Sequence, residues 1–204
     1  MRHTSQRPRW YPTAVTLSNG SILVVGGTDT ESGNAQPNLE ILPRIPGGDT
    51  TIYLDFLAQT HPWNLYPFLF VLPSGNIFIG GSTLPLPSPI QSLMGGSSTA
   101  YYNQARVLDK TTFGTVSVMP MIPGLEAGSF NSGRTYPWSG AAVMLPLKPP
   151  YTAPATILIC GGATLDKIGL DTCVSITPEA PNPQWTVEHM VCPDRLFGNF
   201  LKLT

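Results

Sequence analysis

Short apolar runs separated by turn residues recur along the chain, and one arrangement of them is repeated. Its first copy starts at Arg9-Trp10-Tyr11-Pro12, passes an Asn19-Gly20 turn, and continues as an apolar run over residues 22–25 into Gly26-Gly27. A β-branched apolar run bounded by an Asn-Gly turn and a double glycine is typical of a β-hairpin. Residues 9–27 are therefore predicted to form two antiparallel strands.

The same arrangement returns at residues 64–81 and 134–162. The second copy starts at Tyr66-Pro67 and the third at Tyr136-Pro137, and both end in a double glycine. Arg195-Leu196-Phe197 stands where a fourth copy would begin. A repeat of this size, made of short strands with a double glycine after the second strand of the hairpin, is typical of the four-stranded blades of a kelch-type β-propeller.

Further candidate strands complete four strands in each repeat. They lie at residues 39–42, 51–57, 100–109, 115–119, 173–177 and 185–190. Helical repeats are excluded, because no window has sustained helical spacing of apolar residues and prolines interrupt the chain throughout. We predict an all-β, partial kelch-like β-propeller. It has a tail at 1–8, blades at 9–60, 61–131 and 132–190, and the start of a fourth blade at 191–204.

Composition favours turn-rich β structure over disorder. The 22 prolines and 20 glycines lie between apolar runs, and only 11% of residues are charged, against about 25% in ordinary globular proteins. A net charge of −1 without any lysine or arginine cluster argues against nucleic-acid binding and against an acidic membrane partner. Neither a signal peptide nor a membrane-spanning run is predicted in the chain as given.

Cysteines and histidines form no recognisable metal-binding motif. Cys160, Cys173 and Cys192 are widely spaced and lack a Cys-x-x-Cys pair, so a zinc site is not predicted, whereas a disulfide between two of them stays open. His61 falls in a predicted connection between blades, and His189 lies alone in a predicted strand. We do not expect either histidine to bind metal.

The polar Pro/Ser/Gly segment at residues 84–99 has no predicted structure of its own. Loops of this length often act as functional lids. An expansion in a tolerant surface loop is the alternative, and it is the interpretation that we favour.

Five separated motifs occur in one order between Arg9 and Thr204. They are Arg9-Trp10-Tyr11-Pro12-Thr13, Asn64-Leu65-Tyr66-Pro67-Phe68, Tyr136-Pro137, Ile159-Cys160-Gly161-Gly162 and Trp185-Thr186-Val187-Glu188-His189-Met190. Together they resemble the N-terminal propeller region of fungal and plant glyoxal oxidases. These are copper radical oxidases related to galactose oxidase, so the resemblance implies an extracellular protein with a seven-bladed kelch-like propeller.

The resemblance also implies a copper site in the full-length protein, with Tyr11 as one ligand. In this family copper is held by two tyrosines and two histidines, and the equatorial tyrosine is joined to a cysteine by a thioether and stores a radical. That tyrosine belongs to the Arg-Trp-Tyr-Pro motif, which places it at Tyr11. A phenolate suits Cu(II), and a sulfur-substituted ring is easier to oxidise, so metal and ligand can each deliver one electron.

Several parts of the family's site have no counterpart in the chain. No cysteine precedes Tyr11, so the thioether cannot form as it does in the family. The other copper ligands come from blades beyond the last residue, Thr204. Tyrosine also stands at Tyr66 and Tyr136, where the family assigns no metal role, so packing is the alternative role for Tyr11. We therefore expect a protein truncated at both ends that does not bind copper stably by itself.

Three functions remain as hypotheses. The resemblance implies that the full-length protein oxidises small aldehydes to carboxylic acids while reducing O2 to H2O2, and that this chain alone is inactive. A non-catalytic kelch-type propeller that binds a carbohydrate or a protein is the alternative. An incomplete gene model or a degraded copy without function is the third. Copper content separates the first hypothesis from the others, because a binding module has no reason to retain copper.

An incomplete propeller is also expected to self-associate. An open array of blades leaves two apolar faces without a neighbour, and Phe197, Phe200 and Leu201 begin a hairpin that lacks its second strand. Large exposed apolar patches promote association, and few charges are present to oppose it. We predict that the isolated chain is oligomeric or insoluble.

Overall fold

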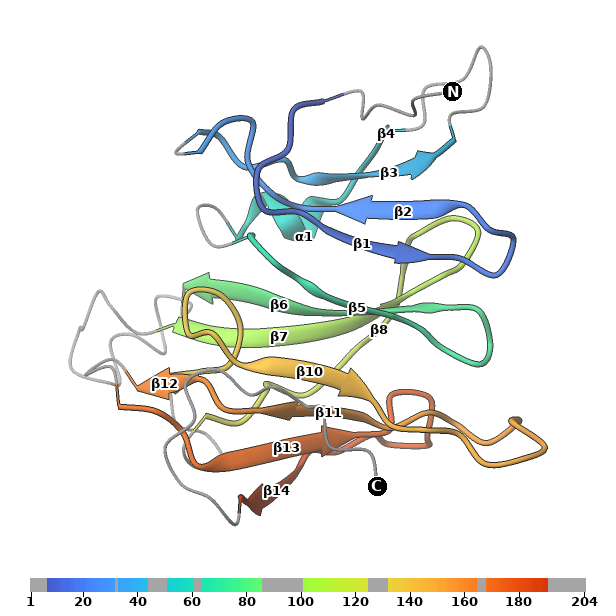
Figure 1. Ribbon diagram of the computed structural model, residues 1–204, viewed down its shortest axis with the longest axis vertical. Helices are drawn as coiled ribbons and strands as arrows, with labels where there is room; N and C mark the ends of the chain where they lie inside the picture. Colours follow the sequence, from blue (N-terminus) through green and yellow to red (C-terminus); the bar gives the residue numbers. More distant parts are fainter. Residues whose placement is uncertain are drawn as a thin grey trace.

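Three four-stranded sheets follow one another along the chain (Figure 1). The computed structural model describes residues 7–31, 33–43, 51–60, 64–85, 101–124, 132–164 and 168–190. Neighbouring strands within each sheet pair antiparallel, and the single α-helix in these residues, α1 (Asp55–Ala58), is one turn long. No helix in the described part of the chain is long and apolar enough to cross a membrane. The predicted all-β fold is confirmed.

Blade one contains the strands β1 (Thr13–Thr16), β2 (Ile22–Val25), β3 (Asn38–Leu42) and β4 (Thr51–Tyr53), in this spatial order. The last predicted strand, at residues 51–57, is only partly correct, because the chain turns into α1 after Tyr53. Phe56 and Leu57 of α1 are both buried. Consecutive residues of a strand point to opposite faces, so a helical turn is what allows both side chains to enter one core.

Blades two and three have the same meander. Blade two consists of β5 (Phe68–Val71), β6 (Ile77–Pro85), β7 (Tyr101–Leu108) and β8 (Thr115–Val118). Blade three consists of β10 (Ala141–Met144), β11 (Ile157–Cys160), β13 (Thr172–Ile176) and β14 (Thr186–His189). A small pair that the sequence did not predict, β9 (Ser132–Gly133) with β12 (Ala163–Thr164), lies beside blade three. The predicted blade limits at 60/61 and 131/132 and the fourth blade at 191–204 adjoin or fall in segments outside the described residues, so they stay predictions.

Apolar cores fill the spaces between neighbouring blades. Ile77 and Ile79 of β6 pack in the core shared with blade one, whereas Phe78 packs in the core shared with blade three. This alternation follows from the period of two along a strand. Because both faces of the middle blade are covered, its sequence reads as an uninterrupted apolar run. Each fully buried side chain of this kind stabilises the fold by about 1.5–3 kcal/mol.

The double glycine that follows β2 allows two backbone segments to approach closely. A Cβ on Gly26 would lie 2.6 Å from the carbonyl oxygen of Asn64, and one on Gly27 would lie 2.5 Å from that of Trp10. Both glycines also have positive φ, at +72° and +86°, which other residues rarely adopt. The repeat therefore couples Gly-Gly to the Tyr-Pro segments because these elements are in contact.

Candidate functional site

Three tyrosines from the repeated motif lie side by side at the starts of the three blades. The ring centroids of Tyr11 and Tyr66 are 5.2 Å apart, and those of Tyr66 and Tyr136 are 5.8 Å apart. Trp10 meets the edge of Tyr11 with its centroid 5.9 Å away. We call these four residues the aromatic row. Each tyrosine precedes the first strand of its blade, which confirms that the three occupy equivalent places.

The backbone of the aromatic row has an uncommon conformation. Tyr11 and Tyr66 have φ angles of 57° and 51°, and Ser139, close to Tyr136 in the chain, has 57°. Positive φ is an outlier for a bulky side chain, and such strained residues cluster at ligand and active sites. The Tyr66 amide N–H donates a hydrogen bond of 3.1 Å to the carbonyl oxygen of Tyr11. Adjacent blades are therefore joined at the row itself.

The phenols of the aromatic row are accessible and influence one another. Tyr11 is 36% exposed and Tyr66 is 45% exposed. Partial burial is the main cause that raises the pKa of Tyr66, and the negative charges of ionised Tyr11 and Tyr136 raise this pKa further. Ionisation at the centre of the row is thus disfavoured, and Tyr66 keeps its phenolic proton to a higher pH than an isolated tyrosine.

A cavity opens beside the row between blades two and three. Its volume is about 380 Å³ and its lining residues are Tyr66, Phe68, Tyr136, Ser139 and Gly140. None of these side chains is charged at neutral pH, and most of the wall is aromatic. Small-molecule sites are commonly mainly apolar, with a few polar groups that orient the ligand. The cavity therefore suits a small neutral molecule.

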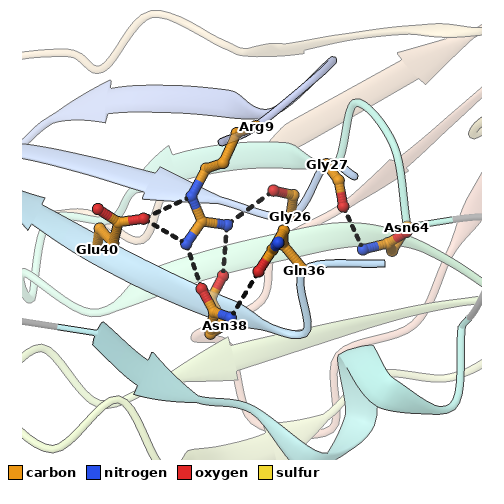
Figure 2. A network of polar contacts seen from close by, with 7 residues as sticks. All are labelled: Arg9, Gly26, Gly27, Gln36, Asn38, Glu40 and Asn64. Carbon is orange, nitrogen blue, oxygen red and sulfur yellow. Dashed lines mark hydrogen bonds and ion pairs between the residues drawn. The ribbon is translucent and has the colours of Figure 1, made fainter. Parts of the chain in front are cut away.

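Arg9, two residues before Tyr11, holds the end of blade one (Figure 2). Its Nε donates to Glu40 Oε1 at 2.8 Å, and its Nη1 donates to the carbonyl oxygens of Gly26 and Asn38 at 2.9 and 3.2 Å. Nη2 donates to the side-chain oxygen of Asn38. Burial lowers the pKa of Arg9, and its bonded partner Glu40 acts in the opposite direction. This arginine thus fixes the segment that carries Tyr11.

Arg134, two residues before Tyr136, holds the corresponding end of blade three. Its side chain is fully buried. Its Nη1 donates to the carbonyl oxygens of Gly161 and Thr172 at 2.8 and 2.7 Å, and its Nη2 donates to Thr172 Oγ1 at 2.6 Å. Nε and Nη2 also donate to the carbonyl oxygens of Pro123 and Gly124. Burial lowers the pKa of Arg134 to about 10.

Blade two lacks this arginine and ends differently. Asn64 stands in its place and donates to the carbonyl oxygen of Gly27 at 3.0 Å. In blades one and three the pairing of the second and third strands stops at the double glycine, whereas β6 and β7 continue to pair as far as Pro85 and Tyr101. Continued pairing satisfies the backbone groups that an arginine satisfies in the other two blades.

The two arginines are structural anchors of the segments that carry Tyr11 and Tyr136, and the sequence alone did not predict this role. The available signal was an arginine two residues before tyrosine in the first and third copies, with asparagine in the second. Sequence alone did not show that Asn38 and Thr172, the first residues of β3 and β13, would be the acceptors.

The described residues do not assemble a copper site around Tyr11. No group of three histidine, cysteine, aspartate or glutamate side chains with metal-binding geometry occurs among them. Cys160 and Cys173 face each other across β11 and β13 and form a disulfide, which answers the question that the sequence left open. His189 lies on the surface with Nδ1 3.5 Å from a carboxylate oxygen of Asp171. His61, Cys192 and most of the 84–99 loop lie outside the described residues.

Comparison with known proteins identifies the sequence that carries Tyr11. The sequence model of the family described as "Glyoxal oxidase N-terminus" matches residues 1–84. The chain carries a glyoxal oxidase N-terminal region. It is also 30% identical to the aldehyde oxidase GLOX of Vitis pseudoreticulata, over 96% of this chain and 32% of that protein. These findings confirm the resemblance expected from the motifs.

Two other proteins also match most of the chain. A WSC domain-containing protein of Arthroderma benhamiae is 48% identical over 91% of this chain and 18% of that protein. Among solved structures, that of YjhT superposes with a TM-score of 0.51 at 14% identity and covers 92% of this chain and 54% of that one. At this identity the likeness shows the β-propeller fold alone. The chain spans less than a third of the length of the Arthroderma benhamiae protein and of the Vitis pseudoreticulata aldehyde oxidase.

Proposed function

We propose that this chain is part of a glyoxal-oxidase-like copper radical oxidase, and that the whole protein oxidises small aldehydes to carboxylic acids while reducing O2 to H2O2. Tyr11 is the proposed radical tyrosine of that enzyme. The observation that carries the proposal is the position of the Arg9-Trp10-Tyr11-Pro12 motif inside the segment that matches the glyoxal oxidase N-terminus. A relative named as an aldehyde oxidase, which aligns with nearly the whole chain, supports it.

The position of Tyr11 is compatible with this role. The Arg9 network anchors the segment on its N-terminal side, and the hydrogen bond to Tyr66 anchors it toward blade two. Tyr11 is 36% exposed, which leaves room for further groups to approach it. This chain thus supplies a rigidly held phenol at an accessible place.

The described residues do not fit a complete copper site, so we derive no copper-dependent step from them. Among the described residues, Tyr11 has the aromatic neighbours Trp10 and Tyr66, and no group of three metal-binding side chains occurs in this part of the chain. The disulfide occupies Cys160 and Cys173, which removes two of the three cysteines as partners for a thioether. We propose that the remaining ligands belong to other parts of the whole protein and that the chain alone is inactive.

We also propose that the protein works outside the cell. Disulfides persist in oxidising compartments such as the extracellular space, and the Cys160–Cys173 bond supports this location. The resemblance to secreted oxidases agrees with it.

A non-catalytic binding module is the second candidate function. The cavity beside Tyr66 and Tyr136 supports it, because aromatic walls without charges suit a neutral ligand such as a carbohydrate. In that case neither copper nor Tyr11 would be required for function.

The proposal for the isolated chain is tested by loading it with Cu(II) and supplying oxygen and methylglyoxal. We expect neither peroxide production nor a thioether, and copper should be removed by desalting. A loss of a pair of hydrogens that maps to Tyr11 joined to a cysteine would contradict the proposal. So would peroxide production that depends on the chain.

A further inference from the structure

We propose that Tyr11 and Tyr66 form an oxidation site in which a one-electron oxidant joins their two rings as an intramolecular dityrosine. This modification needs no copper and goes beyond the proposed aldehyde oxidation. It concerns the described residues of this chain only, so it stands or fails independently of the proposed function.

The first argument is the fixed geometry of the pair. The two ring centroids are 5.2 Å apart and the ring planes are inclined by 34°. The backbone hydrogen bond from Tyr66 to Tyr11 holds the two residues together. Each tyrosine also has positive φ and is followed by a proline, which further limits the backbone. The rings therefore meet without any rearrangement of the blades.

The second argument is the exposure of the two tyrosines. Tyr11 is 36% exposed and Tyr66 is 45% exposed, so a small soluble oxidant can reach either residue. In dityrosine the new bond joins the ring carbons next to the hydroxyl groups, so coupling needs two neighbouring rings, as in this pair.

Other aromatic pairs are less suited to coupling. Tyr66 and Tyr136 are 5.8 Å apart with their planes inclined by 50°. Trp10 approaches Tyr11 at 72°, edge to face. Tyr151, at 61%, is more exposed than Tyr11 and Tyr66. Exposure alone, however, favours coupling between two molecules over coupling within one. The pair Tyr11 and Tyr66 is therefore the expected product.

The reaction balances as two one-electron oxidations. Each tyrosine gives one electron to the oxidant and loses its phenolic proton, which leaves two phenoxyl radicals. The radicals combine through their ortho carbons to form one carbon–carbon bond. The two ortho hydrogens then move to the oxygens, which restores both phenols. The chain loses one pair of hydrogens in total, and two equivalents of a one-electron acceptor, such as a ruthenium(III) complex, are reduced.

The experiment oxidises the full chain in dilute solution with photogenerated ruthenium(III) tris(bipyridine). An equal mixture of isotopically heavy and ordinary chain distinguishes coupling within one chain from coupling between chains. Peptide mass spectrometry and dityrosine fluorescence then locate the product. The variants are Tyr11→Phe and Tyr66→Phe, which keep the packing of the rings, with Tyr151→Phe as the matched control. A thermal transition measured for each variant establishes that it is folded.

We expect a peptide that joins Tyr11 to Tyr66, with both halves heavy or both ordinary and a pair of hydrogens missing. Tyr11→Phe and Tyr66→Phe should lose this product, and Tyr151→Phe should retain it. The proposal is overturned if folded wild-type chain gives only mixed-isotope products or no cross-link. It is also overturned if the intramolecular product survives in Tyr66→Phe or joins Tyr66 to Tyr136 instead.

Discussion

Arg134 lies in blade three where Arg9 lies in blade one, and the two guanidinium groups make matching contacts. Each donates to the carbonyl oxygen of the first glycine after the second strand, Gly161 or Gly26. Each also donates to the carbonyl oxygen of the first residue of the third strand, Thr172 or Asn38. An arginine of the repeated motif therefore adds donors beside the last backbone bonds, from Gly26 to Asn38 and from Gly161 to Thr172, where the two strands separate.

Replacing Arg134 by methionine is expected to destabilise blade three strongly. The change removes the donor from the buried carbonyl oxygens of Gly161, Pro123 and Gly124. Each unsatisfied buried group costs about 1–3 kcal/mol, so we expect the free energy of unfolding to fall by about 3 kcal/mol or more. Urea denaturation measures the change. The control is Lys148→Met, since Lys148 is exposed, and a loss for Arg134→Met as small as that of the control would contradict the account.

The pKa of Tyr66 is expected to fall when Tyr11 is replaced by phenylalanine. The negative charge of ionised Tyr11 then no longer opposes the ionisation of Tyr66, although burial still does. Since the pKa of Tyr66 is raised on folding, its contribution to stability is present below the ordinary tyrosine pKa of 10.0. That contribution is lost as the pH rises through the folded pKa.

A titration followed by NMR of the tyrosine rings tests this coupling. Tyr11→Phe should shift the Tyr66 titration to lower pH, and Tyr151→Phe should leave it unchanged. Identical Tyr66 titrations in wild type and Tyr11→Phe would show that the two phenols do not interact.

The sequence predicted the hairpins and the equivalence of the blades because these depend on local signals. Asn19-Gly20 specifies a turn, and the double glycines mark the ends of the second strands in blades one and three, whereas β6 of blade two continues past its double glycine to Pro85. Contacts between distant segments had no such signal. The reach of Arg134 to Thr172, the disulfide between Cys160 and Cys173, and the approach of Tyr11 to Tyr66 all depend on how strands are placed in space.

At the short helix α1, the local sequence pattern predicted the wrong kind of element. The sequence predicted one strand over residues 51–57, because the apolar residues Leu54 and Phe56 are separated by the polar Asp55. The core between blades one and two accepts both Phe56 and Leu57, and this tertiary demand overrides the local pattern.

The isolated chain is expected to self-associate. Val116 and Val118 on the last strand of blade two are 58% and 48% exposed, and few charges oppose contact between copies. Sedimentation should therefore find oligomers or aggregates. Val116→Lys adds a charge to the β8 edge and should reduce association through it. A compact wild-type monomer of 21.9 kDa with a cooperative thermal transition would contradict this prediction.

The proposed function is tested most directly by peroxide production from methylglyoxal. The protein to measure is a longer one that contains this chain with the sequence that flanks it in its gene, loaded with copper. Tyr136→Phe is the matched control for Tyr11→Phe, because both tyrosines occupy the same place in their blades. We predict that wild type and Tyr136→Phe produce H2O2 and that Tyr11→Phe does not. Peroxide production that survives in Tyr11→Phe, or a copper-loaded protein that oxidises no aldehyde, would contradict the account.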